Sequence, residues 1–175
     1  MSVSIRSAVP SDAALILAFV RELADYEKLA HEVVADEAAL TDALFGSNPR
    51  VFCDIAEQDG APAGFALWFH TFSTFEGRHG IHLEDLFVRP RFRGAGVGRA
   101  LVERLARRCV DEGLARLEWS VLKWNAPAIS FYESLGAVAM DGWTVYRTHG
   151  AALARLSGQA ASRAGRRAGD EDGTR

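Results

Sequence analysis

Apolar positions in the first third of the chain switch from strand spacing to helix spacing. Residues 4–8 predict a short strand. The next apolar residues recur three or four positions apart, as on one face of a helix: Leu15, Ile16, Phe19, Val20 and Leu23. Ser11 or Asp12 can accept hydrogen bonds from the first free N–H groups of this helix, which extends to about residue 27. A second helix is expected over residues 36–45 and ends at Gly46.

The middle of the chain predicts a β-hairpin. Two apolar runs, residues 51–57 and 64–72, flank the turn-forming sequence Asp59-Gly60-Ala61-Pro62. The two strands are therefore expected to pair in antiparallel fashion. Residues 73–80 are expected to form a loop. The pattern then predicts a strand at 81–88, a helix at 97–112, a strand at 115–121, a helix at 127–135 and a strand at 143–148.

This order of elements predicts an α/β fold, with a mixed sheet and helices on both of its faces. The 175 residues are enough for one domain with a core of its own, and we place that domain at residues 1–156. Residues 157–175 contain no large apolar side chain. Such a segment cannot offset the entropy lost on ordering, so a disordered C-terminal tail is expected.

Composition narrows the class of protein. With 49% hydrophobic and 25% charged residues, the chain has globular composition. The net charge of −3 gives no reason to expect a nucleic-acid partner. We expect no membrane partner either, because no apolar run approaches the roughly 18 residues of a membrane span and the N-terminus lacks the apolar block of a signal peptide. Cys53 and Cys109 fit buried free thiols in a reducing compartment, so a cytoplasmic location is expected. The five histidines lack metal-ligand spacing, and no metal is expected.

The stretch from Arg91 to Arg99 holds three glycines at alternate positions between a predicted strand and a predicted helix. Its backbone N–H groups can point outward at the positive end of the helix dipole, where a phosphate or pyrophosphate binds. The flanking arginines add charge and fork-shaped donors. The spacing excludes a P-loop, which needs Gly-Lys-Ser/Thr, and a G-x-G-x-x-G dinucleotide loop, whose last position holds Arg99 or Leu101. The alternative is a plain glycine-rich turn before a surface helix.

Two adjacent carboxylates, Glu84 and Asp85, stand near the end of the strand that leads into this loop. Neighbouring side chains on a strand point to opposite faces, so one of the two should face the core side, which is costly for an unpaired charge. One interpretation is a bulge or edge position where both are solvated. The other is that one or both line a cleft and act on a cationic substrate. Which of the two faces the cleft is left open.

The residues from Trp124 to Tyr132 form a second group. Asn125 can cap the helix that Pro127 opens. Ile129 and Tyr132 are three positions apart and share one face of that helix. Taken alone, Tyr132 is an ordinary core aromatic residue, and its neighbours in the sequence are what suggest a further role.

Together these motifs resemble the GNAT superfamily of N-acetyltransferases. R-x-x-G-x-G, starting at Arg93, is similar to its acyl-CoA pyrophosphate loop, and N-x-x-[AS]-x-x-[FL]-Y-x-x-x-G, its second motif, is matched from Asn125 to Gly136. More narrowly, the chain resembles the diamine/polyamine acetyltransferase family, which includes relatives acting on thialysine, at residues 21–28, 83–88, 93–98, 124–125 and 141–143. The resemblance implies a mostly antiparallel, twisted sheet in a single domain, acetyl-CoA as co-substrate, and a homodimer.

The resemblance also implies roles for single residues. The backbone of Leu86, Phe87 and Val88 would bind the pantetheine arm like an added strand, and the Leu86 N–H would hold the thioester carbonyl. Asn125 would steady the cofactor near its sulfur, and Tyr132 would be the general acid that protonates the departing thiolate. The pyrophosphate would be held by Arg93, Gly94, Ala95, Gly96, Val97, Gly98 and Arg99.

The expected acceptor is a primary amine. Its pKa is about 10.4, and a thioester needs a neutral nitrogen, so a group must accept the proton. Glu84, directly or through a water molecule, is the predicted base. The rest of the substrate would contact an acidic, aromatic subsite of Tyr26, Glu27, Asp85, Asp141 and Trp143. The segment 137–141 is shorter and carries less acid than in the polyamine enzymes, which favours an amine smaller than spermine.

The sequence therefore predicts direct acetyl transfer, in a ternary complex, from acetyl-CoA to a small cationic amine. One alternative is a non-catalytic acyl-CoA-binding regulatory module, against which the presence of both Tyr132 and Glu84 argues. Another is acetylation of peptide or protein amines, because an acidic subsite would also suit a lysine side chain.

Overall fold

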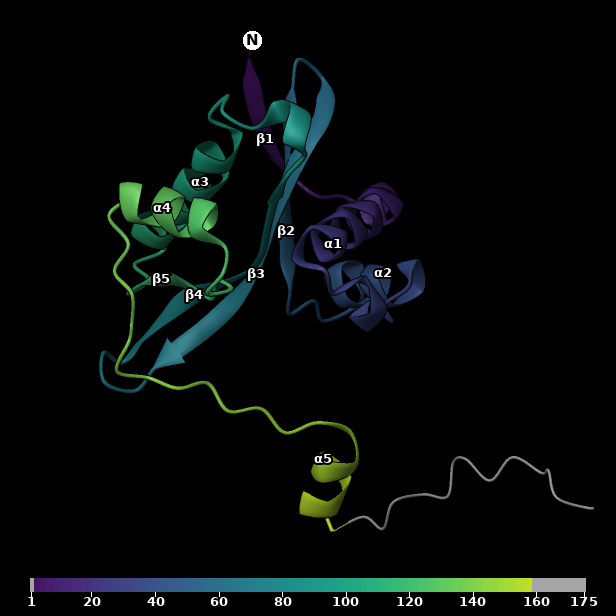
Figure 1. The fold of residues 1–175 in the computed structure, drawn as a ribbon, viewed down its shortest axis with the longest axis vertical. Helices are drawn as coiled ribbons and strands as arrows, with labels where there is room; N and C mark the ends of the chain where they lie inside the picture. Colours follow the sequence, from purple (N-terminus) through teal and green to yellow (C-terminus); the bar gives the residue numbers. More distant parts are fainter. Residues whose placement is uncertain (1, 159–175) are drawn as a thin grey trace, which may run out of the picture. The chain divides into compact units, whose positions relative to one another are not determined.

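The structure is a computed structural model, and it describes residues 2–158 (Figure 1). Residues 159–175 lie outside the described residues, so the disorder expected there stays a prediction, as does the boundary at residue 156. Residues 2–136 contain the sheet and the helices α1 to α4. Residues 137–158 are a separate part with one short helix, α5 (Gly150–Leu156), that the sequence pattern did not predict.

The strands lie in the sheet in the same order as in the chain. The first three pairings are antiparallel and the last is parallel. The strands are β1 (Val3–Ser7), β2 (Phe52–Gln58), β3 (Ala61–Ser73), β4 (Arg78–Val88) and β5 (Leu117–Trp119). The predicted α/β fold with a mixed, mostly antiparallel sheet is confirmed.

Helices cover both faces of the sheet (Figure 1). On one face lie α1 (Ala13–Glu27) and α2 (Glu37–Phe45), and on the other lie α3 (Val97–Asp111) and α4 (Ala126–Ser134). Short 3-10 turns occur at Pro10–Asp12, Ala30–Glu32 and Pro90–Phe92.

Each face has its own apolar core. On the α1 side, Phe19 stacks on Phe65 of β3 with 5.3 Å between the ring centroids, and both are fully buried. On the α3 side, Leu101 and Leu105 are fully buried against the sheet. Burying one such side chain contributes about 1.5–3 kcal/mol. The helical spacing seen in the sequence thus marks the core-facing side of both long helices.

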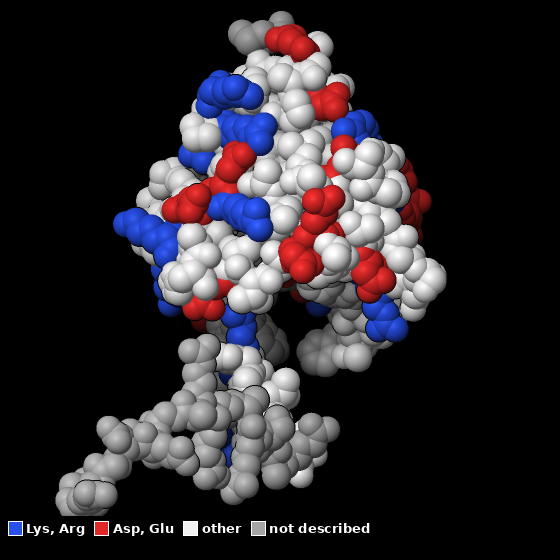
Figure 2. Space-filling model, turned by 90° about the vertical axis from the view of Figure 1, so that its right-hand side faces the viewer, with Lys and Arg blue, Asp and Glu red and all other residues white. Residues whose placement is uncertain are grey.

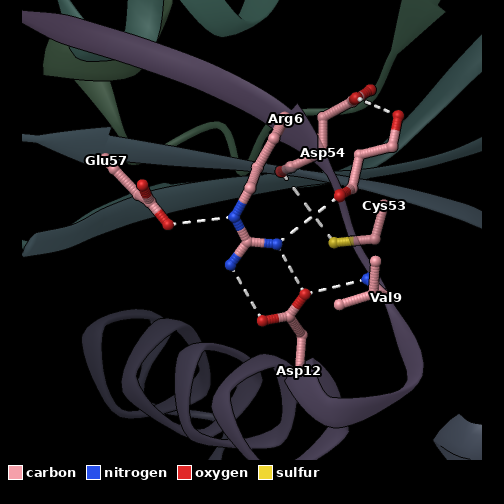
Figure 3. A network of polar contacts seen from close by, with 7 residues as sticks. Arg6, Val9, Asp12, Cys53, Asp54 and Glu57 are labelled. Atoms are coloured by element: carbon pink, nitrogen blue, oxygen red, sulfur yellow. Dashed lines mark hydrogen bonds and ion pairs between the residues drawn. The ribbon is translucent and has the colours of Figure 1, made fainter. Parts of the chain in front are cut away.

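Ion pairs of Arg6 tie β1 to Glu57 of β2 and to Asp12 in the turn before α1 (Figure 3). The guanidinium of Arg6 donates to Asp12 at 2.6 and 2.9 Å and to Glu57 at 2.9 Å. Asp54, only 2% exposed, accepts from Arg104 of α3 at 2.7 Å and from the indole of Trp68 at 3.0 Å. A buried carboxylate is tolerated when it is paired in this way.

Charges of both signs are interspersed on the side of the molecule that carries α1 and α2 (Figure 2). This distribution agrees with the small net charge of −3.

Three local predictions were wrong. The loop expected over residues 73–80 shrinks to residues 74–77, because β3 and β4 pair as far as Ser73 and Arg78. The strand expected at 143–148 is absent, because these described residues form no regular secondary structure. Asp12 does not cap α1, because its carboxylate turns back to Arg6 and to the Val9 N–H at 2.8 Å.

Candidate active site

The sheet opens between β4 and β5. The two strands pair only where residues 81–83 lie beside residues 117–119. Beyond that point β4 continues to Val88, while the other strand has ended. A pocket of about 760 Å³ opens at this separation, within the usual size for small-molecule sites. It is lined by residues 83–88, by residues 119–122, by the end of α1 and by α4.

The glycine-rich loop forms one end of the pocket. Gly94 and Gly96 have φ of +76° and +83°, the left-handed region that favours glycine. A Cβ at either position would meet nothing within 4 Å, so conformation rather than space requires glycine there. The first backbone bond into α3 is donated by Ala100 to Gly96, at 2.9 Å. The N–H groups of residues 97–99, which line the pocket, thus have no acceptor in the preceding turn and suit an anion.

The backbone of β4 offers hydrogen-bonding groups to the pocket. The Arg89 N–H donates to Ala63 on β3, at 2.9 Å. Because N–H and C=O groups alternate in direction along a strand, those of Leu86 and Val88 point away from β3, toward the opening. The Val88 carbonyl already accepts from Arg93 Nε, at 2.9 Å. Leu86 is therefore the better placed of the two for an external partner.

A β-bulge separates the two adjacent carboxylates. Asp85 lies opposite Leu67, but Leu83 lies opposite Trp68, so Glu84 is an extra residue without a partner in the register. The Glu84 side chain is 55% exposed, and its carboxylate lies 3.7 Å from His82 Nε2. Asp85 is partly buried on the α1 face. The sequence-based alternative of a bulge is thus right, but the expectation of two solvated carboxylates holds only for Glu84.

Two partly buried carboxylates line the pocket, and neither is paired with a cation of residues 2–158. Asp85 and Glu27 both line it, and neither has a hydrogen bond or ion pair with residues 2–158. Burial, then the charges of Glu84 and Glu27, raise the pKa of Asp85 to about 6. Burial also raises the pKa of Glu27. A positively charged ligand would therefore bind favourably beside these two carboxylates.

Tyr132 projects from α4 into the same pocket. Its ring packs against Trp119, with 4.8 Å between the ring centroids. Burial, and then the negative charge of Glu27, raise its pKa to about 12. The hydroxyl has no hydrogen-bond partner within the described part of the chain. It is thus a protonated, unpaired donor in the pocket.

Asn125 joins two walls of the pocket. Its side-chain oxygen accepts from the Ala128 N–H at 3.3 Å, which confirms the predicted helix cap. The same oxygen accepts from the Tyr26 hydroxyl at 3.1 Å. The Arg93 guanidinium lies 4.8 Å from the centroid of the Tyr26 ring.

Most of the predicted site residues line the pocket, but three do not. Ala95 does not line it. Asp141 and Trp143 belong to the separate part formed by residues 137–158, so their role in the acceptor subsite stays a prediction. Sequence reasoning missed Trp119, whose only signal was an aromatic residue in a predicted strand. The other lining residues it missed are Leu23, Leu83, Phe92, Ser120, Val121, Leu122, Pro127, Ala128 and Phe131.

Two structural absences concern the described residues only. Residues 2–158 contain no group of three or more His, Cys, Asp or Glu side chains that could hold a metal ion. Within the same range, the helices are too short or too polar to cross a membrane.

The open sheet with its helices has the fold of the GNAT acetyltransferases. The chain belongs to the acetyltransferase (GNAT) family, whose sequence profile matches residues 17–137. It is an N-acetyltransferase, and enzymes of this family use acetyl-CoA as co-substrate.

Relatives and solved structures agree with this assignment. The chain is 38% identical over 169 residues to the thialysine N-epsilon-acetyltransferase of Sus scrofa, covering 90% of this chain and 99% of that protein. It is 30% identical over 194 residues to the L-ornithine N5-acetyltransferase NATA1 of Arabidopsis thaliana, covering 85% of each. Among solved structures, an integron cassette protein from the mobile metagenome of V. cholerae aligns with a TM-score of 0.74 at 28% identity, over 90% of this chain and 98% of that one.

Proposed function

We propose that the protein transfers an acetyl group from acetyl-CoA to the primary amine of a small cationic substrate, a diamine, polyamine or thialysine-like amine. The transfer is direct, within a ternary complex. One observation carries the proposal: a single pocket holds an anion-binding helix N-terminus, an unpaired Tyr132 hydroxyl and two carboxylates without a cation.

The residues present fit the co-substrate. The N–H groups of residues 97–99 and the side chains of Arg93 and Arg99 would hold the pyrophosphate, with Gly94 and Gly96 giving the loop its left-handed turns. The backbone of residues 86–88 would hold the pantetheine arm, and the Leu86 N–H would face the thioester oxygen. Asn125 would position the arm near the sulfur.

Tyr132 is the proposed general acid. With a pKa of about 12 it stays protonated at neutral pH, so it has a proton to give to the leaving sulfur. Its hydroxyl is not engaged elsewhere within the described chain. Glu84 on β4, directly or through a water molecule, would take the proton that the amine must lose.

The acceptor amine would bind beside Glu27, Asp85 and Tyr26. Two unpaired carboxylates match a substrate with more than one positive charge. The names of the thialysine and ornithine relatives both specify a side-chain nitrogen as the acetylated atom. Asp141 and Trp143 would extend the subsite from the second part of the chain.

A homodimer and a cytoplasmic location complete the proposal. The second part carries the large apolar side chains Val138, Trp143 and Tyr146, which a second copy would cover. Both cysteines are free, as in a reducing compartment. Sedimentation at micromolar concentration should give about twice the 19.0 kDa chain mass, and a monomer would refute the dimer.

The deciding experiment incubates the protein with acetyl-CoA and a panel of diamines, polyamines, thialysine, ornithine, lysine and a lysine peptide. Release of CoA with a small amine supports the proposal. Transfer to the peptide alone would move the protein to the class that acetylates peptides, and CoA binding without any transfer would make it a binding module.

Tyr132→Phe tests the general acid. Turnover should fall by about 10²-fold or more, while acetyl-CoA affinity stays within a few-fold. Unchanged turnover in Tyr132→Phe would remove Tyr132 from its role.

A further inference from the structure

We propose that the indole of Trp119 sets the size of the acyl group that the enzyme transfers, so that acetyl-CoA is preferred over donors with longer chains. The inference rests on the proposed acetyl transfer and adds a residue that decides donor specificity in the same pocket. Its starting point is the place where β4 and β5 separate.

Trp119 and Leu83 form the end of the pocket at the last paired position of the two strands. Trp119 is the final residue of β5, and its register partner on β4 is Leu83. Side chains of register partners project from the same face of a sheet, and these two lie in or against the apolar core under α3. Leu83 is 1% exposed, yet both residues line the pocket. The gap between the strands therefore ends at two apolar side chains.

The donor would run toward this end of the pocket. With its pyrophosphate at residues 94–99, the pantetheine arm would follow β4 backwards from Val88 to Leu86. The next pocket end in that direction is the pair of Leu83 and Trp119. Three residues of strand span at most about 10 Å, so an acyl group bound at Leu86 would lie close to these two side chains. A longer acyl chain would extend toward the indole.

The Tyr132 ring holds the indole from the side of α4. The ring centroids of Trp119 and Tyr132 are 4.8 Å apart, with an interplanar angle of 45°. Because the Tyr132 hydroxyl would act on the thioester sulfur, the indole packed against that ring is also next to the acyl group bonded to the sulfur. Side chains packed in this way do not yield without strain, so extra methylenes would be rejected.

Of the two residues at the pocket end, Trp119 has the larger side chain and the less confined one. Leu83 is fixed in the core, where truncation would mainly destabilise the fold. Trp119 is only partly buried. A smaller side chain in place of the indole should therefore lengthen the space for the acyl group and leave the core in place.

The reaction of a longer donor has the same balance of atoms. The amine first gives one proton to the base, and its nitrogen then forms the C–N bond to the acyl carbon as the C–S bond breaks. Tyr132 protonates the sulfur, CoA leaves as the thiol, and the second N–H proton of the amine restores the Tyr132 hydroxyl through solvent. Trp119 exchanges no proton in these steps and acts through the space that it fills.

Trp119 also supports the Tyr132 ring, and a ratio of rates separates the two effects. Loss of that support would slow every donor alike, because Tyr132 acts on a sulfur atom that all acyl-CoA thioesters share. Loss of the wall would favour long donors over acetyl-CoA. The ratio of kcat/KM for butyryl-CoA to kcat/KM for acetyl-CoA therefore reports on the wall alone.

The first experiment measures kcat/KM for acetyl-, propionyl- and butyryl-CoA with one acceptor amine of the panel. In the wild type the value for butyryl-CoA should be about 100-fold or more below that for acetyl-CoA. Trp119→Leu should raise the butyryl-to-acetyl ratio about tenfold or more, and Trp119→Phe should raise it less. Trp124→Leu is the matched control. That tryptophan is 53% exposed and does not line the pocket, so this variant should keep the wild-type ratio.

Two results would overturn the inference. One is a wild-type enzyme that uses butyryl-CoA as well as acetyl-CoA. The other is a Trp119→Leu variant that is active with acetyl-CoA and keeps the wild-type ratio. If Trp119→Leu does not fold, Trp119→Phe, which keeps an aromatic ring against Tyr132, decides the question in the same way.

A second measurement needs neither a variant nor an amine. Ketone analogues of acetyl-CoA and butyryl-CoA, in which a methylene replaces the sulfur, bind without reacting. In isothermal titration calorimetry the wild type should bind the butyryl analogue about tenfold or more weakly than the acetyl analogue. Equal affinities in an enzyme that acetylates amines would overturn this inference alone. A wild type that acetylates no amine of the panel would remove the proposed function, and the inference with it.

Discussion

The Tyr26 hydroxyl donates a hydrogen bond of 3.1 Å to the side-chain oxygen of Asn125, 99 positions further along the chain. The bond joins the last turn of α1 to the cap of α4, from opposite faces of the sheet. The Tyr26 ring also lies 6.0 Å from that of Trp124, centroid to centroid. Side chains therefore close the part of the pocket where β4 and β5 no longer pair.

Tyr26→Phe removes this bond and keeps the ring. We expect the free energy of unfolding to fall by about 1 kcal/mol and the KM for the amine to rise about fivefold, since α1 carries Glu27. Denaturant unfolding and initial rates measure the two effects. A loss of stability at unchanged KM would mean that the bond supports the fold but not the site.

Gly96→Ala tests the loop conformation against a matched glycine. Gly96 and Gly60 have φ of +83° and +78°, and a Cβ at either would meet nothing within 4 Å. Both alanine variants should lose about 1 kcal/mol, the cost of a left-handed residue. Only Gly96→Ala should raise the KM for acetyl-CoA, because only its loop would hold the pyrophosphate. Equal KM values would place the phosphates elsewhere.

Arg104→Met leaves the Asp54 carboxylate buried without its cation. Since Asp54 is 2% exposed, we expect the protein to lose about 3 kcal/mol of stability. Arg107→Met, an exposed position on the same helix, should change stability by less than about 0.5 kcal/mol. Combining Arg104→Met with Asp54→Asn should recover part of the loss. A stable Arg104→Met variant would show that the Trp68 bond suffices for Asp54.

Acid should weaken the pairing of Asp12. The hydrogen bond from Arg6 lowers the pKa of Asp12, so its contribution is complete above the unfolded-state pKa of about 4 and is lost as the pH falls through the folded-state value. The gap in unfolding free energy between the wild type and Asp12→Asn should therefore be constant from pH 7 to 5 and shrink below about 4. Asp111→Asn, an exposed unpaired carboxylate, is the control. If this difference in unfolding free energy did not change with pH, the stabilisation by Asp12 would come from packing and not from its charge.

Much of the fold and site could be predicted because local patterns decide them. The apolar stripes of α1 and α3, the left-handed glycines and the Asn125 cap each depend on residues close together in the sequence. The sequence offered a bulge at Glu84 and Asp85 only as one of two alternatives, because the choice depends on how β4 aligns with β3. The exposure of Glu84 and the burial of Asp85 follow from that register. The alternating pattern at 143–148 gave a strand that does not form, since pairing needs a neighbour that a pattern cannot supply.

The parting of β4 from β5 has a kinetic consequence. Asp85 lies on the α1 face of the sheet, whereas the glycine-rich loop leads into α3 on the opposite face. If the two substrates bind as proposed, donor and acceptor reach the gap from opposite sides, and neither blocks the route of the other. The enzyme then needs no compulsory order of addition, and a product can leave on its own side while the partner product is still bound.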